Sequence, residues 1–470
     1  MGGKWKLVLC CAVPLLILMM PRAFIPLDGL TVVEHRLIAI FAMAAIFWVL
    51  EPIPIFATSL LIIVAELVML SDKGFVLFVA GGGADFGTLL SYRAIMGAFA
   101  SPIIMLFLGG FFLAIAATKY RLDQNLARIL LKPFGTDPRF ILLGLMGITA
   151  VFSMFMSNTA TTAMMLAILM PVVKAFDPED PGRAAFVLAV PFAANIGGIG
   201  TPIGTPPNAV ALKYLAGDHA VSFGQWMGFA IPYVVVMLAF LWFVLCVMFP
   251  SRQRQVQVEI KGRFLTHWKA VVVYVTSGAT ILLWLTDFLH GMNSYVVAMI
   301  PLGVFAATQV ITAEDLKRIS WDVLWLVAGG IALGEGLEQS GLAKRVVTQI
   351  PFDALPPFLI VIAATGVAVG MATLMSNTAT ANLLLPMVAA LGAGLPGLAG
   401  LGGMKMLVIV VTFSCSLAMA LPVSTPPNAM AHATGWVNTR QMARCGIIVG
   451  LVGLLASYGL MALLHLAGFF

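Results

Sequence analysis

Two short polar stretches interrupt an otherwise apolar chain. Residues 156–165 read MSNTATTAMM, and residues 375–384 read MSNTATANLL. Serine, asparagine and threonine are favoured helix N-caps, because their side-chain oxygens accept hydrogen bonds from unpaired backbone N–H groups. A helix-forming run follows each motif, so each presents hydroxyls, an amide and backbone N–H groups at the positive end of a helix dipole. The two stretches therefore predict an anion site that needs neither arginine nor lysine.

A second motif, TPPN, follows each of these stretches, at 205–208 and again at 425–428. Two consecutive prolines remove two N–H donors and restrict the preceding residue, so a helix must open there. The opened backbone exposes carbonyl oxygens, which suit a hard cation such as Na⁺. Each half is thus expected to hold a cation between a tip and a break, while the two tips face one anion with a carboxylate at each end. The predicted helix-break residues are Pro206, Pro207, Asn208, Pro427 and Asn428.

The composition places these motifs in a membrane. Of the 470 residues, 61% are hydrophobic and 10% are charged, whereas a soluble domain carries roughly 25% charged residues. Apolar runs such as 226–249 approach the ~20 residues that a helix needs to cross a bilayer. The fold class is therefore an all-α polytopic membrane protein in contact with lipid. The basic residues are dispersed and form no compact patch, so no nucleic-acid partner is expected.

Eleven segments are candidates for crossing the membrane. They lie near 5–21, 37–51, 53–70, 102–118, 184–217, 226–249, 269–288, 292–311, 321–337, 405–433 and 445–467. The first has no small-residue cleavage pattern after it and is interpreted as a retained helix. Two further stretches, 140–172 and 356–390, are too long for one crossing and carry the Ser-Asn-Thr motifs near their middle. We predict that they are re-entrant hairpins, whose tips lie where protein or a water-filled cavity satisfies the backbone.

The loop charges predict an orientation. With a cytoplasmic N-terminus and hairpins that return to their own side, most of the 26 lysine and arginine residues fall in cytoplasmic loops. This bias obeys the positive-inside rule, and the reverse layout would break it. An integral protein of the cell (inner) membrane with its N-terminus inside is the expected arrangement.

The chain is internally repeated. The pair GG at 109–110 returns at 329–330, and both the SNT and TPPN motifs recur at nearly the same offset. An odd number of predicted crossings, five, separates the two hairpins, so the second unit must be inverted relative to the first. Inverted repeats with interrupted helices are typical of secondary transporters, whose binding site lies where the two units meet.

These motifs resemble those of the divalent anion/sodium symporter family, which includes sodium-coupled dicarboxylate and citrate carriers. The resemblance rests on SNTATTAMM, SNTATANLLLP, GTPPNAV, TPPNAMA and EPIP at 51–54, and it extends from about residue 27 to the C-terminus. It implies a homodimer of about eleven transmembrane helices plus two hairpins, in which a transport domain moves against a scaffold as an elevator. The expected division is 1–118 as scaffold, 119–249 as first transport part, 250–337 as scaffold and 338–470 as second transport part.

The resemblance also implies roles for individual residues. Substrate carboxylates would contact Ser157, Asn158, Thr159, Ser376, Asn377, Thr378, Thr425 and Pro426. Sodium would be held by Ser153, Ser157, Asn158, Gly204, Thr205, Thr373, Asn377 and Ser424. The strict counterpart of Ser153 in the second half is Ala372, with Thr373 adjacent, so a backbone carbonyl is an alternative ligand there. Na⁺ is the expected coupling ion, and no organic cofactor is expected.

Three functions compete at this point. The first is sodium-coupled symport of C4-dicarboxylates such as succinate, malate and fumarate. The second keeps the fold but exchanges dicarboxylates, or carries citrate or sulfate. The third is a membrane-embedded enzyme, which would need clustered histidine, acidic or cysteine residues at membrane depth. The six histidines are scattered, and neither HExxH nor GxSxG occurs, so the sequence favours a transporter of a di- or tricarboxylate anion.

Overall fold

Helices form almost all the regular structure of this chain. A computed structural model describes residues 2–80, 83, 85–256, 258, 263–349, 352 and 355–470. Among these residues the β-structure is one isolated bridge between Ser71 and Leu90. The all-α class predicted from composition is confirmed.

The first half of the chain contains twelve of the α-helices that the structure describes. Their bounds are α1 Gly2–Met19, α2 Val32–Leu50, α3 Ile55–Met69, α4 Val76–Val79, α5 Tyr92–Gly97, α6 Pro102–Lys119, α7 Leu122–Leu131, α8 Pro138–Phe155, α9 Asn158–Lys174, α10 Gly182–Gly198, α11 Pro206–Tyr214 and α12 Phe223–Met248. Short 3-10 turns lie at Arg22–Phe24, Ala98–Ala100, Lys132–Phe134 and Gly217–His219.

The described part of the second half repeats the same order from α17 onward. Its helices are α13 Trp268–Leu285, α14 Asp287–His290, α15 Ser294–Ala307, α16 Ala313–Leu316, α17 Trp321–Gln339, α18 Leu342–Gln349, α19 Pro357–Leu374, α20 Asn377–Gly394, α21 Pro396–Ala399, α22 Gly403–Ser416, α23 Pro426–Ala433 and α24 Thr439–Leu466. A spanning-length helix, a short helix, a hairpin and a broken helix thus follow one another in both halves, as α6–α11 and as α17–α23.

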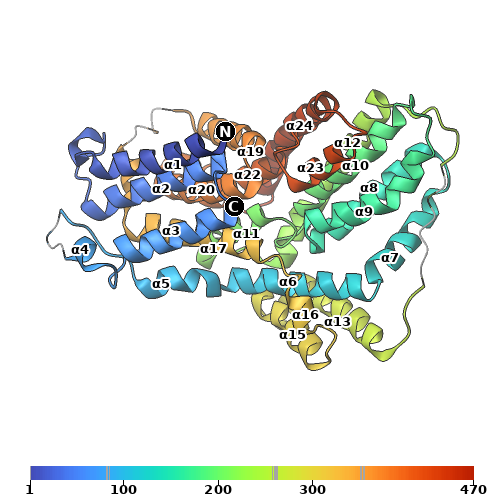
Figure 1. The fold of residues 1–470 in the computed structure, drawn as a ribbon, viewed down its shortest axis with the longest axis horizontal. Coiled ribbons are helices and arrows are strands. Elements are labelled where there is room, and N and C mark those ends of the chain that lie inside the picture. Colours follow the sequence, from blue (N-terminus) through green and yellow to red (C-terminus); the bar gives the residue numbers. More distant parts are fainter. Residues whose placement is uncertain are drawn as a thin grey trace.

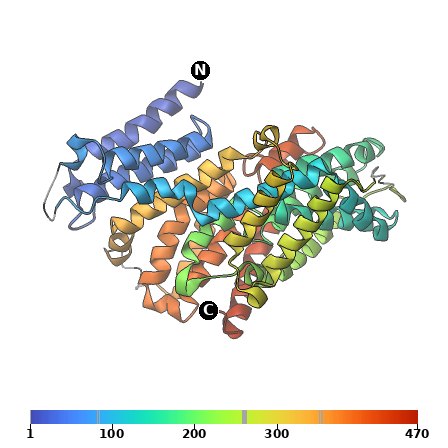
Figure 2. The same cartoon turned by 90° about the horizontal axis from the view of Figure 1, so that it is seen from below.

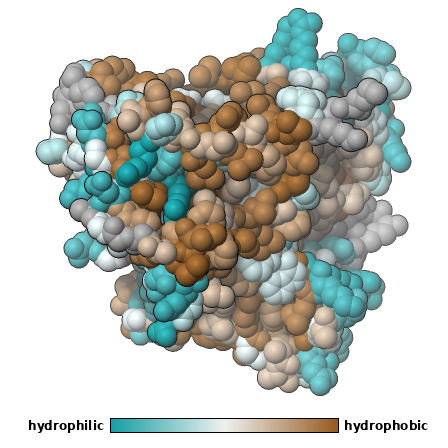
Figure 3. Space-filling view, turned by 60° about the vertical axis from the view of Figure 1, so that its left-hand side comes forward, coloured by the Kyte–Doolittle hydropathy of each residue, from teal (hydrophilic) through white to brown (hydrophobic). Residues whose placement is uncertain are grey.

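Several helices have the length and composition of membrane spans. Among the described residues, seven helical segments are long and apolar enough to cross a bilayer, including α2, α12 and α24. On the face in Figure 3, hydrophobic side chains cover much of the middle and hydrophilic ones gather toward the edges. The protein is therefore an integral membrane protein, as its composition predicted.

Both stretches predicted as hairpins are divided into two packed helices. The first ends at Phe155 and restarts at Asn158, and the second ends at Leu374 and restarts at Asn377. The two residues between the helices are extended in each case, with ψ of 140° at Ser157 and 144° at Ser376. The helices of each hairpin contact one another, α8 with α9 and α19 with α20. Both motif-bearing turns are therefore the tips of helical hairpins.

The helices pack as two groups. One group contains α1–α3, α5, α6, α13, α15 and α17, and the other contains both hairpins with α10–α12 and α22–α24. Figures 1 and 2 show α1–α3 toward one end of the long axis and α7–α9 toward the other. These groups correspond to the sequence ranges expected to form the scaffold and transport parts, whose roles remain a prediction.

The repeated glycine pair explains the closest contacts of the first group. A Cβ at Gly109 would lie against the Ala298 carbonyl of α15, and one at Gly329 would lie against Ser59 of α3. Helix α6 therefore approaches α15 as α17 approaches α3, through equivalent small residues. The repeat seen in the sequence is thus a repeat in helix packing.

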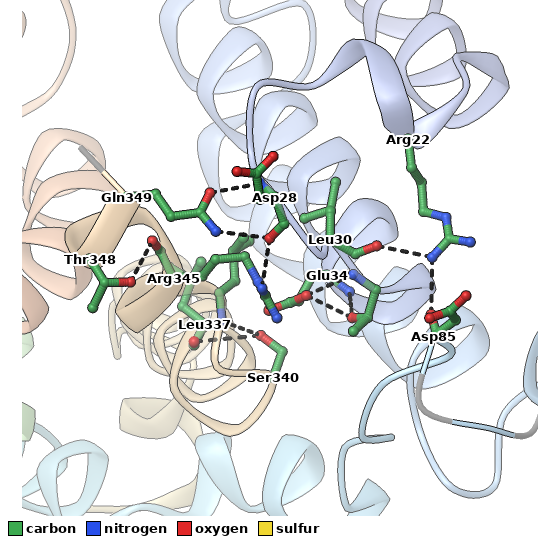
Figure 4. A network of polar contacts seen from close by, with 12 residues as sticks. Arg22, Asp28, Leu30, Glu34, Asp85, Leu337, Ser340, Arg345, Thr348 and Gln349 are labelled. Carbon is green, nitrogen blue, oxygen red and sulfur yellow. Dashed lines mark hydrogen bonds and ion pairs between the residues drawn. The ribbon is translucent and has the colours of Figure 1, made fainter.

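A short amphipathic helix precedes each hairpin, which the search for apolar spans did not reveal. Helix α18 is attached to the start of α2 and to the loop before it (Figure 4): Arg345 Nε donates to Glu34 Oε1 of α2 at 2.8 Å. Arg345 Nη1 and Gln349 Nε2 both donate to the Asp28 carbonyl, at 2.9 and 2.8 Å. Because the Glu34 carboxylate is almost fully buried, this attachment ties α18 closely to the first group.

Candidate functional site

Each hairpin tip is built by an N-capping serine. The Ser157 hydroxyl accepts from Ala160 N at 3.2 Å, and the Ser376 hydroxyl accepts from Ala379 N at the same distance. This is the cap geometry that the residue types predicted. The two tips differ in exposure, since Asn377 and Thr378 are buried whereas Asn158 is half-buried and Thr159 is exposed.

The break between α10 and α11 is held open by one asparagine. Asn208 Nδ2 donates to the carbonyls of Gly198, Ile199 and Thr201, at 3.1, 3.4 and 2.8 Å. These carbonyls have lost their intrahelical partners because the helix stops at Gly198. The TPPN asparagine therefore braces the broken segment, which the prolines alone would only interrupt.

The break between α22 and α23 repeats this brace and adds a contact from the other half. Asn428 Nδ2 donates to the Met419 and Leu421 carbonyls at 2.9 and 3.1 Å. Asn195 of α10 donates through Nδ2 to Thr425 Oγ1 and Asn428 Oδ1, both at 3.2 Å. The first half thus fixes the break of the second.

Oxygen atoms gather around the first tip and its break. Ser153 Oγ donates to Asn158 Oδ1 at 2.6 Å. A Cβ at Gly198 would lie 2.7 Å from Asn158 Oδ1 and 3.0 Å from the Gly204 carbonyl oxygen. Ser153, Asn158 and Gly204, all predicted sodium ligands, are therefore neighbours around the Gly198 backbone. Neutral oxygens at this density are suited to Na⁺.

The second half brings together a matching set with one difference. Ser424 Oγ donates to the Thr373 carbonyl at 2.9 Å, which links the hairpin to the break. The Thr373 hydroxyl instead donates within its own helix, to Val369 O at 2.7 Å. The Thr373 group that faces the break is therefore its carbonyl, the alternative left open by the sequence. Asn377 Oδ1 is buried without a hydrogen-bond partner among the described residues.

One cavity joins the two half-sites. It has a volume of about 450 Å³, and all eight residues predicted to contact substrate line it: Ser157, Asn158, Thr159, Ser376, Asn377, Thr378, Thr425 and Pro426. Gly204, Thr205 and Ser424 of the predicted sodium ligands line it as well, and so do the helix-break residues Pro206 and Pro427. Ser153, Thr373, Pro207, Asn208 and Asn428 lie outside the lining, of which Ser153, Asn208 and Asn428 support it through the hydrogen bonds above.

The cavity also has a wall that motif reasoning missed. Helix α6 contributes Phe107 and Phe111, α10 contributes Asn195, and α17 contributes Asp322, Val323 and Leu326. Asn195 had a detectable signal, as an amide side chain inside an apolar run. Asp322 and the phenylalanines had none, because only the docking of the two helix groups brings them to the motifs.

Six helices begin at this cavity. The first-turn residues of α3, α9, α11, α17, α20 and α23 all line it. Helix N-termini carry partial positive charge, so their convergence favours an anion. No lysine, arginine or histidine is present among the described residues that line the cavity, and Asp322 is its one formal charge there. Anion binding would depend on helix dipoles, hydroxyls, amides and bound cations.

Comparisons with known proteins agree with this geometry. Residues 3–465 match the family described as "Sodium:sulfate symporter transmembrane region". The sodium-dependent dicarboxylate transporter SdcS of Staphylococcus saprophyticus is 31% identical over 94% of this chain and 88% of its own length. SdcS of Staphylococcus aureus is 32% identical over 88% of this chain and 83% of its own length.

Two solved structures share the fold. The Alcanivorax borkumensis YdaH transporter superposes with a TM-score of 0.56 over 79% of this chain and 87% of its own, at 13% identity. Neisseria gonorrhoeae MtrF gives a TM-score of 0.51 over 86% of this chain and 94% of its own, at 12% identity. At such low identity the likeness concerns the fold alone.

Fold and cavity together define a helical membrane transporter with interrupted helices at its centre. The chain belongs to the sodium:sulfate symporter family, because the family match covers almost its full length. The family resemblance inferred from the SNT and TPPN motifs is thereby confirmed, and the enzyme alternative is set aside.

Proposed function

We propose that this protein is a sodium-coupled symporter of C4-dicarboxylates such as succinate, malate and fumarate. The observation that carries the proposal is the single cavity lined by both Ser-Asn-Thr tips and both TPPN breaks. Two capped helix N-termini facing one space suit an anion with a carboxylate at each end. The names of the SdcS relatives, sodium-dependent dicarboxylate transporters, point to the same substrate class.

Sodium coupling is supported by the oxygens beside each tip. Ser153 and Asn158 meet the Gly198–Gly204 backbone in one half, and Ser424 meets the Thr373 carbonyl in the other. A cation in either position would neutralise part of a dicarboxylate's charge in a cavity whose described lining contains no basic side chain. Anion and cation would then each strengthen the binding of the other, which is the thermodynamic basis of symport.

The transport movement would be an elevator. Under this proposal the hairpins are re-entrant, the two halves are inverted repeats, and the group containing α8–α12 and α19–α24 moves against the other group. The groups meet mainly where α17 packs against α20 and α11, and this seam is where one group would slide past the other. A homodimer in the cell membrane with a cytoplasmic N-terminus completes the proposal.

The test is uptake of radiolabelled succinate into liposomes that contain the purified protein. An inward Na⁺ gradient should drive accumulation, and K⁺ in place of Na⁺ should abolish it. Asn158→Ala and Asn377→Ala should each lower uptake at least about tenfold, since each removes a tip amide that is not replaced. Asn438→Ala is the matched control, because Asn438 caps α24 and does not line the cavity.

Other outcomes point to the alternatives. Uptake without Na⁺ that requires dicarboxylate inside the liposomes would identify an exchanger. Absence of succinate uptake by folded protein, with uptake of citrate or sulfate, would overturn the substrate class and keep the fold. Equal uptake by Asn377→Ala and wild type would contradict the role of the second tip.

A further inference from the structure

Asp322 is an unexpected residue in a cavity proposed to bind anions. It lies in the first turn of α17 and lines the cavity together with Val323 and Leu326. Its side chain is exposed, and none of the ion pairs of the described residues involves it. An unpaired carboxylate at this position places negative charge where substrate carboxylates are proposed to bind.

The negative charge of Asp322 is large compared with the positive charge that the helix N-termini provide at the cavity. Each helix N-terminus counts as about half a positive charge, so six of them correspond to roughly three charges. The negative charge of Asp322 offsets about one of these, which leaves roughly two positive charges contributed by the protein itself. Of the two first-group helices that begin here, α17 has an acidic residue in its first turn and α3 has none. The offset therefore acts at one wall of the cavity.

We propose that Asp322 sets the charge that the cavity accepts, so that dicarboxylates bind and tricarboxylates of similar size are excluded. The inference rests on the proposed function and narrows its substrate class. A third carboxylate on the substrate would meet the Asp322 carboxylate at the cavity wall, where the effective dielectric constant is below that of bulk water and like charges repel more strongly. Specificity would thus come from a repulsive element as well as from attractive tips.

The ordinary alternative is that Asp322 only stabilises the start of α17, as acidic residues commonly do in a first helical turn. Two probes separate the alternatives: glutarate, and tricarballylate, which is glutarate with a third carboxylate on its central carbon. The measurement is the ratio of the concentrations of tricarballylate and glutarate that halve Na⁺-driven succinate uptake in neutral buffer. A merely structural role would change uptake or stability but leave this ratio unaltered.

Wild type should require a much higher concentration of tricarballylate than of glutarate. Asp322→Asn should lower the ratio about tenfold, as expected for removal of one unfavourable charge pair, and Asp322→Lys should lower it further. Asp322→Glu, which keeps the charge, should retain the wild-type ratio. Glu314→Gln is the matched control, since Glu314 is an exposed acid in the preceding helix α16 that does not line the cavity.

An unchanged ratio in both Asp322→Asn and Asp322→Lys would overturn the inference while leaving the proposed function intact. Lack of Na⁺-driven succinate uptake in wild type would instead contradict the proposed function. Because the Asp322 side chain is exposed, the variants are expected to fold, and size-exclusion profiles in detergent check this. The same fall in the ratio for Glu314→Gln would mean that the effect comes from the general field of this surface and would also overturn the inference.

Discussion

Among single residues, Gly198 leaves the space that the Asn158 side chain and the Gly204 carbonyl occupy. Its Cα faces the Asn158 amide and the Gly204 carbonyl, so that an added methyl would lie 2.7 Å from Asn158 Oδ1. We expect Gly198→Ala to displace Asn158 from the first cation site and to raise the Na⁺ concentration for half-maximal uptake at least about tenfold. Succinate uptake at varied Na⁺ concentration in liposomes measures this change.

Two comparisons control this experiment. Gly147→Ala, on the hairpin that carries Asn158, should be neutral, because a Cβ at Gly147 meets no atom within 4 Å. In the second half the matching position is Ala418, so that half already accommodates a methyl group. An unaltered Na⁺ dependence for Gly198→Ala would show that Asn158 does not hold the cation.

A second prediction for a single residue concerns the hydrogen bonds that the Asn208 amide donates. Asn208→Asp keeps the shape but replaces an amide that donates to three carbonyls with a carboxylate that repels them. Loss of these buried hydrogen bonds should cost about 2–3 kcal/mol of stability, seen as a lower unfolding temperature in detergent. Uptake should fall with it, because the break would lose its fixed shape.

Asn438→Asp is the control for that substitution. The Asn438 side chain accepts from Gln441 N at 2.9 Å as an exposed N-cap, and aspartate performs this function equally well. Equal unfolding temperatures for the Asn208 and Asn438 variants would contradict a bracing role for Asn208.

The site residues that could be predicted from the sequence act on nearby backbone, whereas those that could not be predicted act through contacts distant in sequence. Ser157, Ser376 and the TPPN prolines act on backbone within a few positions, so local chemistry predicts their caps and breaks. Asn195 reaches Thr425 across more than two hundred residues, and Asp322 joins the cavity only because α17 packs beside α20. Long-range packing of this kind leaves no local pattern to detect.

At the scale of helices, the contact between α11 and α17 contains a partly buried ion pair. Lys213 Nζ lies 3.3 Å from Glu335 Oε2 and donates to Ile331 O at 3.1 Å. Glu66 of α3, fully buried, contributes a second carboxylate whose oxygens have no hydrogen-bond partner among the described residues. One lysine on a helix of the second group is therefore paired with an acid on the first.

Lys213→Met should consequently weaken the contact between the helix groups. Removing the cation leaves the Glu335 carboxylate uncompensated, and we expect a loss of about 2 kcal/mol, less than for a fully buried pair because part of Glu335 is exposed. Thermal unfolding in detergent measures it, and adding Glu335→Gln should restore part of the loss. Lys317→Met, which breaks an exposed pair with Glu314, should change stability by less than about 0.5 kcal/mol.

The short helices α7 and α18 illustrate a second limit of sequence reasoning. Apolar run length reveals spans, hairpins and breaks, but a helix of ten or eight residues with charges on one face has no run to find. Their placement depends on attachments such as Arg345 to Glu34, whose partners are distant in sequence. The expected boundary at 338 assigns α18 to the second transport part, whereas these attachments join α18 to the first group.

For the whole molecule, the proposed elevator requires some contacts to persist and others to break. Helix α18 is attached to the loop before α2 by the Asp28–Gln349 contacts and to α2 itself by the Glu34–Arg345 contact (Figure 4). Helix α11, by contrast, meets α17 through the Lys213–Glu335 ion pair and through Tyr214, which lies against Gly334. If the groups slide, α18 should remain with α1–α3 as a fixed arm, and the α11–α17 contact should change.

Cross-linking tests this division directly. In a background lacking the five native cysteines, one variant carries Asp28→Cys with Gln349→Cys and another carries Lys213→Cys with Glu335→Cys. Each pair is joined by a short bis-methanethiosulfonate, which forms a disulfide with each cysteine by displacing methanesulfinate and can be removed by reduction. The first cross-link should leave most Na⁺-driven uptake intact, because it joins parts of one rigid group. The second should abolish uptake until the reagent is reduced, because it joins parts that must separate. If the α18 cross-link stops transport, α18 moves with its hairpin and the domain boundary near 338 holds. If the α11 cross-link leaves transport unaffected, the two helix groups do not slide past one another, and the elevator is excluded.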